Sequence, residues 1–494
     1  MMQNNYMRSL FITVGFIVFS CMNTYAQVET GSLLTDAELT LEDAIQVAVA
    51  NNPEVNRAIL SVRDADELVD IAYSEVYPNI SSSLNYTRNI EIPVSYLPAQ
   101  IFDPNAPEGQ LIGVPFGTDN NWQGGFTVQQ NIFRGEVFVG LSTSEIYKAV
   151  QQENLRAVTQ QVITRTRVAY YQVLAAKEQL RLQETQIKRL EQNLNDNQAR
   201  QRAGLVDEYA VLQLEVQLSN QRPQLIEARY GVDEAYRNLK VALGIPLEID
   251  FEVKGTLNSF DIIAADVESG ENAGIKRVDQ MNPFTFEKKY GEWASFIEDR
   301  GDVRVLDARL NLNEKEIQAV KSRFLPTITA SYNLQWSAAQ AGSPKFFQNS
   351  APETAPNRIQ SLAINISLPL FEGFKRTSDV QRAQIARKDI EVQQRAAKLA
   401  AENEIASSAE RLNRSYETAA ARKQALSQAE EGYQRALRRL ENGVGSQIEV
   451  TDAEVQVRQA EVNYALMVFE YLSAKAEYDL ATGRVPFVDM KGAE

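Results

Sequence analysis

Two carboxylates three positions apart, Glu449 and Asp452, are the residues whose types and spacing most favour a charge-based function. They follow a glycine-containing turn at the start of a predicted helix, and an i, i+3 spacing places both side chains on one side of it. Neighbouring carboxylates attract cations and oppose each other's ionisation. A solvated acidic face, which the helix dipole favours at a helix start, also explains the pair, so both interpretations stay open.

Catalytic chemistry has few candidate residues in this chain. The sequence contains no histidine and a single cysteine, Cys21. Histidine is the usual general base near neutral pH and a common ligand of transition metals. No glycine-rich phosphate-binding loop is evident either. We therefore expect no catalytic residue, no metal site and no cofactor, and a protein that is not an enzyme.

Residues 1–26 are predicted to be a secretory signal peptide. Arg8 supplies a positive charge, residues 10–19 form an apolar run, and residues 24–26 resemble a small-residue cleavage site. The apolar run is shorter than the ~20 residues that a transmembrane helix needs. Cleavage after residue 26 would remove Cys21, although lipidation of Cys21 is an alternative. The pattern predicts an exported protein without disulfides.

The charge balance bears on the partners of the chain. It holds 50 Lys and Arg against 65 Asp and Glu, a net charge of −15. This acidic excess argues against binding to nucleic acid. No later stretch of eighteen or more apolar residues occurs, so any insertion into a membrane must use β-strands.

The chain is predicted to be a duplicated unit. Residues 76–80 (VYPNI) match residues 324–328 (FLPTI), and the turn Ala203–Leu205 matches the turn Asn442–Val444. Each unit reads as a helix, two strands, a long helix, a turn and a helix. The predicted boundaries are a first repeat at 27–244, a connecting segment at 245–300, a second repeat at 301–483 and a tail at 484–494.

Four strands are predicted from alternation of apolar and polar residues. The pattern is strict in residues 327–336 and 361–370 and weaker in residues 80–90 and 126–132. A soluble β-sandwich would show the same alternation, but strands of ~10 residues in an exported chain favour an outer-membrane barrel. Since barrels need at least about eight strands, four must be combined with strands of other copies.

Two further features fit strands that span a membrane. Trp122 and Trp336 lie at strand ends, where an aromatic girdle is expected, although ordinary packing is an alternative. The segments near 95–120 and 338–358, between paired strands, are rich in Pro, Gly, Asn and Ser and are predicted to be extracellular loops.

Two very long helices are predicted at residues 136–202 and 375–442, which contain no proline. At 1.5 Å per residue each would extend roughly 100 Å, so each needs packing partners along its length. Heptad-spaced apolar residues supply such a seam in both repeats. In the first repeat these residues are Val173, Leu180, Ile187 and Leu194, followed by Val211, Leu218, Leu225, Val232 and Leu239. The matching positions of the second repeat are Leu412, Ala419, Leu426, Tyr433 and Leu440, followed by Val450, Val457, Tyr464, Tyr471 and Tyr478.

The ordered motifs resemble the TolC-like family of outer-membrane efflux proteins (outer membrane factors) over nearly the whole predicted mature chain. The motifs are LEDA at 41–44, Tyr77-Pro78, Leu325-Pro326, LPLFEG at 368–373, and the turns RAGLVDEYAVLQLE and ENGVGSQIEVTDAE. The resemblance implies an α+β membrane protein that forms a homotrimer. The four strands of each of the three copies would together form one twelve-stranded barrel in outer-membrane lipid. A long α-helical coiled-coil tunnel would continue the barrel through the periplasm.

The resemblance also implies partners and sites. The partners are a periplasmic adaptor (membrane fusion) protein and an inner-membrane transporter. Glu449 and Asp452 align with an acidic pair that lines the closed periplasmic entrance in the family. The two turns resemble the helix tips that contact the adaptor, with Gly204 and Gly443 ending the incoming helices and Asp207 and Ser446 capping the outgoing ones. The tip residues are Arg202, Ala203, Gly204, Leu205, Val206, Asp207, Asn442, Gly443, Val444, Gly445 and Ser446.

The predicted function is the exit duct of a tripartite efflux pump, a passive conduit opened by the adaptor and the pump. The same duct serving type I protein secretion is an alternative that no residue excludes. A surface coiled-coil protein or adhesin is a third alternative, but it does not account for the duplicated strand pairs.

Overall fold

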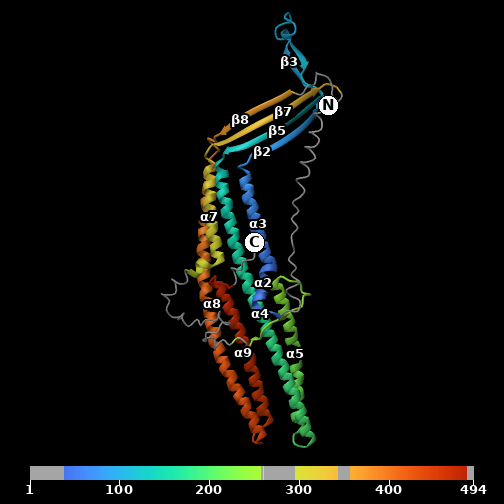
Figure 1. Ribbon diagram of the computed structural model, residues 1–494, viewed down its shortest axis with the longest axis vertical. Helices are drawn as coiled ribbons and strands as arrows, with labels where there is room; N and C mark the ends of the chain where they lie inside the picture. Colours follow the sequence, from blue (N-terminus) through green and yellow to red (C-terminus); the bar gives the residue numbers. More distant parts are fainter. Residues whose placement is uncertain (1–37, 258–259, 261–294, 343–356, 487–494) are drawn as a thin grey trace, which may run out of the picture.

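The computed structural model describes residues 38–257, 260, 295–342 and 357–486. A tilted β-sheet lies at one end of an elongated molecule, and long helices run from it to two separate tips at the opposite end (Figure 1). The predicted signal peptide and most of the predicted segment 245–300 lie outside the described residues.

The sheet has four antiparallel strands in the order β2-β5-β7-β8. Their bounds are Asn79–Arg88, Asn120–Phe133, Thr327–Gln340 and Asn357–Ser367. All four predicted strands are confirmed, and the limits of each differ from the predicted ones. β5 begins six residues before residue 126, and β8 ends at Ser367. Pro369 follows, and a proline has no backbone N–H to continue the ladder. Among the described residues, β2 and β8 are edge strands, each paired on one side only.

The sheet has one apolar face and one uncharged polar face. Register pairs Leu84 with Gly124, Phe126 with Leu334, and Tyr332 with Leu362, and directly paired side chains share a face. Leu84 is 84% exposed and Leu362 is 75% exposed. The opposite face carries no charged side chain. Its members include Ser81, Ser83, Asn85, Gln123, Thr127, Thr329, Ser331, Asn333, Ser361 and Asn365.

Three shorter helices lie between the sheet and the middle of the molecule (Figure 1). α2 (Leu41–Asn51) begins with a capping box between Thr40 and Asp43, and α3 (Pro53–Ser74) has proline at its first position. α7 (Gly301–Ser322) packs on α4. A Cβ at Gly301 would lie 2.7 Å from the Cβ of Ala157, so only glycine permits this approach of the two helices.

The two long helices are confirmed as α4 (Gly135–Arg202) and α8 (Lys375–Glu441). Each folds back at its tip into an antiparallel partner, α5 (Glu208–Leu243) and α9 (Gln447–Ala481) respectively. α4 also contacts α9, which joins the two helical pairs. Within the described part of the chain, no helix is both long and apolar enough to cross a membrane.

The largest apolar core lies where α2 and the start of α3 meet α4, α5, α8 and α9. Val173, Leu239 and Leu412, all predicted seam residues, are fully buried in it. A short parallel pair, β1 (Glu38–Leu39) with β6 (Glu252–Val253), borders this core. A smaller cluster of Leu190, Leu214 and Leu218 continues the seam between α4 and α5 toward the tip.

One predicted loop contains regular structure. Between β2 and β5, β3 (Val94–Pro98) and β4 (Leu111–Pro115) form an antiparallel hairpin, with a short 3-10 helix η2 (Ala99–Ile101) after β3. The hairpin projects beyond the end of the sheet, on the side away from the helices (Figure 1). Prolines and glycines in this segment favoured a loop, but here proline occupies the strand ends.

Candidate functional site

The two helix tips are built by the same backbone hydrogen bonds. The N–H of Leu205 donates to the carbonyl of Arg200 at 2.9 Å, and that of Val444 donates to the carbonyl of Arg439 at 3.0 Å. Gly204 and Gly443 have φ angles of 71° and 72°, the left-handed conformation that ends a helix at low cost when glycine adopts it. The prediction that these glycines end the incoming helices is confirmed.

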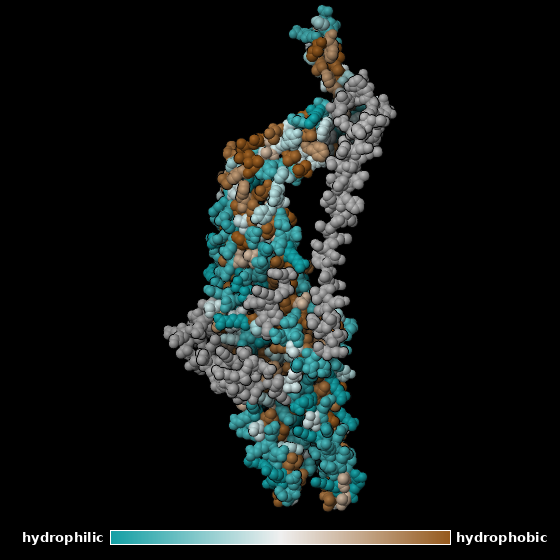
Figure 2. Space-filling model, viewed as in Figure 1, coloured by the Kyte–Doolittle hydropathy of each residue, from teal (hydrophilic) through white to brown (hydrophobic). Residues whose placement is uncertain are grey.

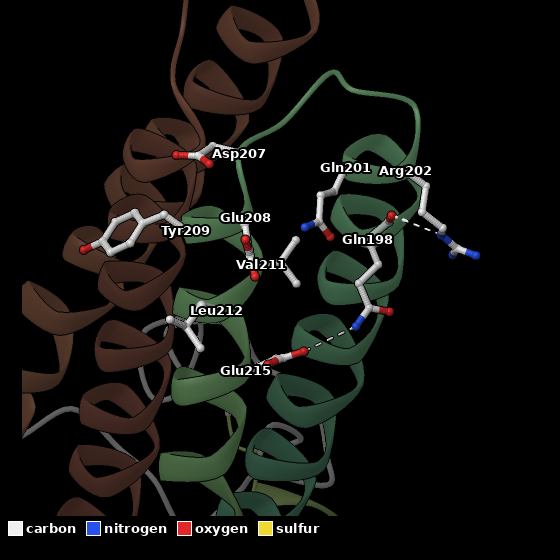
Figure 3. Close-up of a pocket in the computed structure, with 9 residues that line it drawn as sticks. All are labelled: Gln198, Gln201, Arg202, Asp207, Glu208, Tyr209, Val211, Leu212 and Glu215. Carbon is white, nitrogen blue, oxygen red and sulfur yellow. Dashed lines mark hydrogen bonds between the residues drawn. The ribbon is translucent and has the colours of Figure 1, made fainter.

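The caps of the outgoing helices differ. Ser446 Oγ accepts a hydrogen bond from the N–H of Glu449 at 3.2 Å and caps α9 as predicted. Asp207 occupies the cap position of α5, but its side chain makes no capping hydrogen bond, so that part of the prediction is wrong. Its carboxylate points away from α5 and α4 (Figure 3). Its negative charge still lies at the helix start, where the dipole favours it.

Apolar side chains are exposed at matched positions on both tips. Leu205 is 76% exposed and Val444 is 68% exposed, and each directly follows its turn glycine. Tyr209 and Ile448, each at the second position of the outgoing helix, are 68% and 56% exposed. Exposed apolar groups that cluster at a tip favour contact with a partner. Sequence reasoning missed Tyr209 and Ile448, although their equal spacing from Gly204 and Gly443 could have identified them.

A groove of about 770 Å³ lies beside the first turn, between the end of α4 and the start of α5 (Figure 3). We call it the tip groove. Gln198 Nε2 donates to Glu215 Oε1 across it at 3.5 Å. Its charged lining residues are three acids and one base. They are Asp207, Glu208, Glu215 and Arg202. The groove combines a negative balance with apolar side chains of α5.

The predicted acidic pair lies on the exposed face of α9. Glu449 and Asp452 are both exposed, while Val450 between them is buried. Glu449 Oε2 accepts a hydrogen bond from Arg439 Nε of α8 at 3.3 Å. The two carboxylates therefore share a face but differ in environment, since the charge of Glu449 is partly compensated by Arg439.

A buried carboxylate, Glu454, lies two residues after Asp452. Glu454 is 2% exposed, and its Oε2 accepts a hydrogen bond from Asn193 Nδ2 of α4 at 3.4 Å. Burial raises the pKa of Glu454, while the positive charges of Arg189 and Arg458 lower it. Arg458 in turn donates to Gln221 Oε1 of α5 at 2.7 Å. Polar groups thus connect α9 to both helices of the first pair.

Glu454 is not among the site residues predicted from the sequence. The signal was available, because Glu454 stands four residues after Val450 and three before Val457, two predicted seam positions. This spacing places a carboxylate on the buried face of α9.

The two predicted girdle residues lie at the same end and on the same face of the sheet. Trp122 is near the start of β5 and Trp336 is near the end of β7. The Trp122 ring lies 5.2 Å from that of Tyr86, and the Trp336 ring packs edge-on against Phe126 at 6.1 Å. Four aromatic rings therefore gather on the apolar face, in the half of the sheet that is farther from the helices.

Metal binding has no candidate among residues 38–257, 260, 295–342 and 357–486. No group of three or more His, Cys, Asp or Glu side chains there could hold an ion.

Comparison with known proteins identifies relatives of the whole arrangement. The model of the family described as "Outer membrane efflux protein" matches residues 44–245 and 295–484. The chain is 22% identical to the outer membrane protein TolC of Escherichia coli (strain K12) over 463 residues, covering 93% of this chain and 85% of that protein.

Solved structures show the same fold. The CmeC outer membrane channel of Campylobacter jejuni superposes with a TM-score of 0.67 at 15% identity, over 90% of this chain and 85% of that one. The open state of the MtrE outer membrane channel of Neisseria gonorrhoeae gives a TM-score of 0.67 at 16% identity, over 90% of this chain and 88% of that one.

Proposed function

Because the chain belongs to the outer membrane efflux protein family, we propose that three copies of it form the exit duct of a tripartite efflux pump. Members of this family are passive channels of the outer membrane and not enzymes.

The observation that carries the proposal is the four-stranded sheet with two open edges. In lipid, the unpaired backbone groups of β2 and β8 would each cost several kcal/mol, so the edges need strands from other copies. The exposed apolar face suits lipid, and the uncharged polar face suits an aqueous lumen. Three copies joined edge to edge give a closed barrel of twelve strands, with Trp122 and Trp336 in its outer aromatic girdle.

The helices extend the duct into the periplasm. Each copy contributes two antiparallel pairs, α4 with α5 and α8 with α9, and three copies arrange these pairs around one axis as a tunnel. The matching tips and the matching lengths of α4 and α8, 68 and 67 residues, support the duplication of one ancestral unit. Repeat boundaries near residues 244 and 301 fit the ends of α5 and the start of α7.

The tips are proposed to receive a periplasmic adaptor, which links the duct to an inner-membrane transporter. Exposed apolar residues at both tips and the acidic tip groove favour an adaptor surface that is apolar with basic groups at its rim. Glu449 and Asp452, repeated in three copies, would set six carboxylates around the periplasmic entrance, where they attract cations.

The experiment that tests the proposal is a joint measurement of mass and conductance. The purified protein in detergent should have the mass of three chains and should produce discrete ion currents in planar bilayers. A water-soluble monomer that carries no current would overturn the proposed function.

A further inference from the structure

We propose that the hairpin formed by residues 92–116, here called the apical hairpin, is an interface between copies of the chain at the outer mouth of the duct. It contains β3, η2 and β4. The inference rests on the proposed function, because it requires an assembly of several copies.

The apical hairpin carries apolar groups on both faces. Register pairs Tyr96 with Gly113 on one face and Leu97 with Ile112 on the other. Asp103 and Glu108 are the charged residues of the whole segment 92–116. Five side chains that are more than half exposed are Tyr96 (70%), Ile101 (64%), Leu111 (59%), Phe102 (57%) and Phe116 (54%). The hydropathy of this segment is visible as a brown surface above the sheet (Figure 2). Apolar surface of this kind favours burial against a partner.

The apical hairpin is held in a defined position. The two segments that join it to β2 and β5 are paired with each other, because the N–H of Asn89 donates to the carbonyl of Asp119 at 2.8 Å and Asn89 Nδ2 donates to Thr118 O at 2.9 Å. The N–H of Phe116 donates to the carbonyl of Pro93 at 3.0 Å. The exposed apolar groups therefore belong to an ordered surface that is available to a fixed partner.

Lipid does not suit this surface, because polar groups separate it from the apolar face of the sheet. Beyond the rings of Tyr86 and Trp122, Asn120 is fully buried and donates to Gly342 O at 2.7 Å. The Asp119 carboxylate accepts from the N–H of Gly342 at 2.7 Å. Aromatic rings at a barrel end mark the level of the headgroups, so a segment beyond such a polar layer lies outside the hydrocarbon.

A second copy is the occupant that the topology favours. The chain enters the apical hairpin directly from β2, an open edge of the sheet. In the duct this edge pairs with another copy, so each hairpin stands at a seam between two copies. The neighbouring copy therefore lies beside each hairpin, and the strands β3 and β4, which carry no charged side chain, can pack against it without burying an unpaired charge.

Photocrosslinking tests the proposal in the intact protein. The photoreactive analogue p-benzoylphenylalanine is placed at Tyr96, with a matched control at Ser331, which lies on the polar face of the central strand β7. The native mass of each sample is measured before irradiation. We expect a trimer in both samples, and an adduct with the mass of two chains only from the Tyr96 position.

Each other outcome overturns the proposal in a recognisable way. A trimer that gives no adduct at Tyr96, or an adduct with lipid or a different protein, removes the interface between copies and leaves the proposed duct intact. A sample that is not a trimer removes both the interface and the duct.

Discussion

Arg167 of α4 and Asp479 of α9 form a buried ion pair, with 2.9 Å between Nη1 and Oδ2, that joins the first long helix to the last helix of the chain. The two side chains are only 8% and 10% exposed. Lys475, one turn before Asp479, also bonds to this carboxylate. The pair lies at the level where the two helical pairs meet, so it holds the first half of the chain against the second.

Replacing Arg167 with Met should destabilise the protein strongly. Removing one partner of a buried ion pair leaves the other charge poorly compensated and typically costs about 3–5 kcal/mol. Because Lys475 still contacts the Asp479 carboxylate, we expect the loss of unfolding free energy to lie near the lower end of that range. The midpoint of thermal unfolding, followed by circular dichroism in detergent at fixed protein concentration, measures the effect.

Arg165 provides a matched control two residues away. It pairs with Glu54 at 2.8 Å, but the two side chains are 60% and 52% exposed. An exposed pair contributes at most about 1 kcal/mol, so Arg165→Met should change the midpoint little. Equal shifts for the two variants would show that the buried pair has no special role in joining the halves.

Glu454 should make the stability of the helical pairs depend on pH. Burial raises its pKa in the folded protein, so the folded state binds this proton more tightly than the unfolded state does. Above the raised pKa the carboxylate is ionised and its burial lowers the free energy of unfolding by the largest amount. As the pH falls through the raised pKa, the group takes up a proton and this loss of stability disappears. Each unit by which the pKa is raised corresponds to about 1.4 kcal/mol.

The variant Glu454→Gln removes this cost. It should unfold at a higher temperature than the parent protein at pH 8, and the difference should shrink as the pH approaches 5. Exposed Glu470 of the same helix, changed to Gln, serves as the control and should show no such trend. A Glu454→Gln protein that is less stable than the parent at both pH values would contradict the prediction.

The order of elements could be read from the sequence because each has a strong local pattern. Strict alternation of apolar and polar residues in 327–336 predicts a strand with two different faces. The heptad spacing of apolar residues through Val173 predicts a long helix that packs along its length. The turn glycines Gly204 and Gly443 were recognisable because only glycine adopts the left-handed conformation without strain.

Other features depend on tertiary contacts that have no local pattern. The hairpin of β3 and β4 was not predicted, because its prolines stand at strand ends. A strand that ends in proline and a loop that contains proline have the same sequence pattern. Whether Asp207 caps α5 is decided by its side-chain rotamer and not by its type. The partial compensation of Glu449 by Arg439 needs the fold-back of α8 onto α9, which brings together residues ten positions apart.

The exposed apolar residues at the tips should control binding of the adaptor. Burying a side chain of this size at an interface contributes about 1.5–3 kcal/mol, so each of Leu205→Ser, Tyr209→Ser and Val444→Ser should weaken binding by roughly tenfold or more. The affinity of the purified trimer for the purified adaptor measures this. Val241→Ser is the control, because Val241 is 67% exposed but lies at the opposite end of α5. If the Val241 variant weakens binding as much as the others do, the tips are not the docking surface.

The acidic pair should control the block of ion current by divalent cations. The charge of Glu449 is partly compensated by its ion pair with Arg439, whereas Asp452 lies exposed one turn further along α9. Asp452→Asn should therefore weaken the block more than Glu449→Gln, by roughly tenfold for each 1.4 kcal/mol of lost cation binding. The concentration of Mg²⁺ that halves the current of the reconstituted channel is the measured quantity. Glu208→Gln, which removes an exposed acid at the other tip, should leave that concentration unchanged. If Asp452→Asn and the double variant with Glu449→Gln also leave it unchanged, the pair is a solvated acidic helix start stabilised by the dipole, and the entrance is controlled elsewhere.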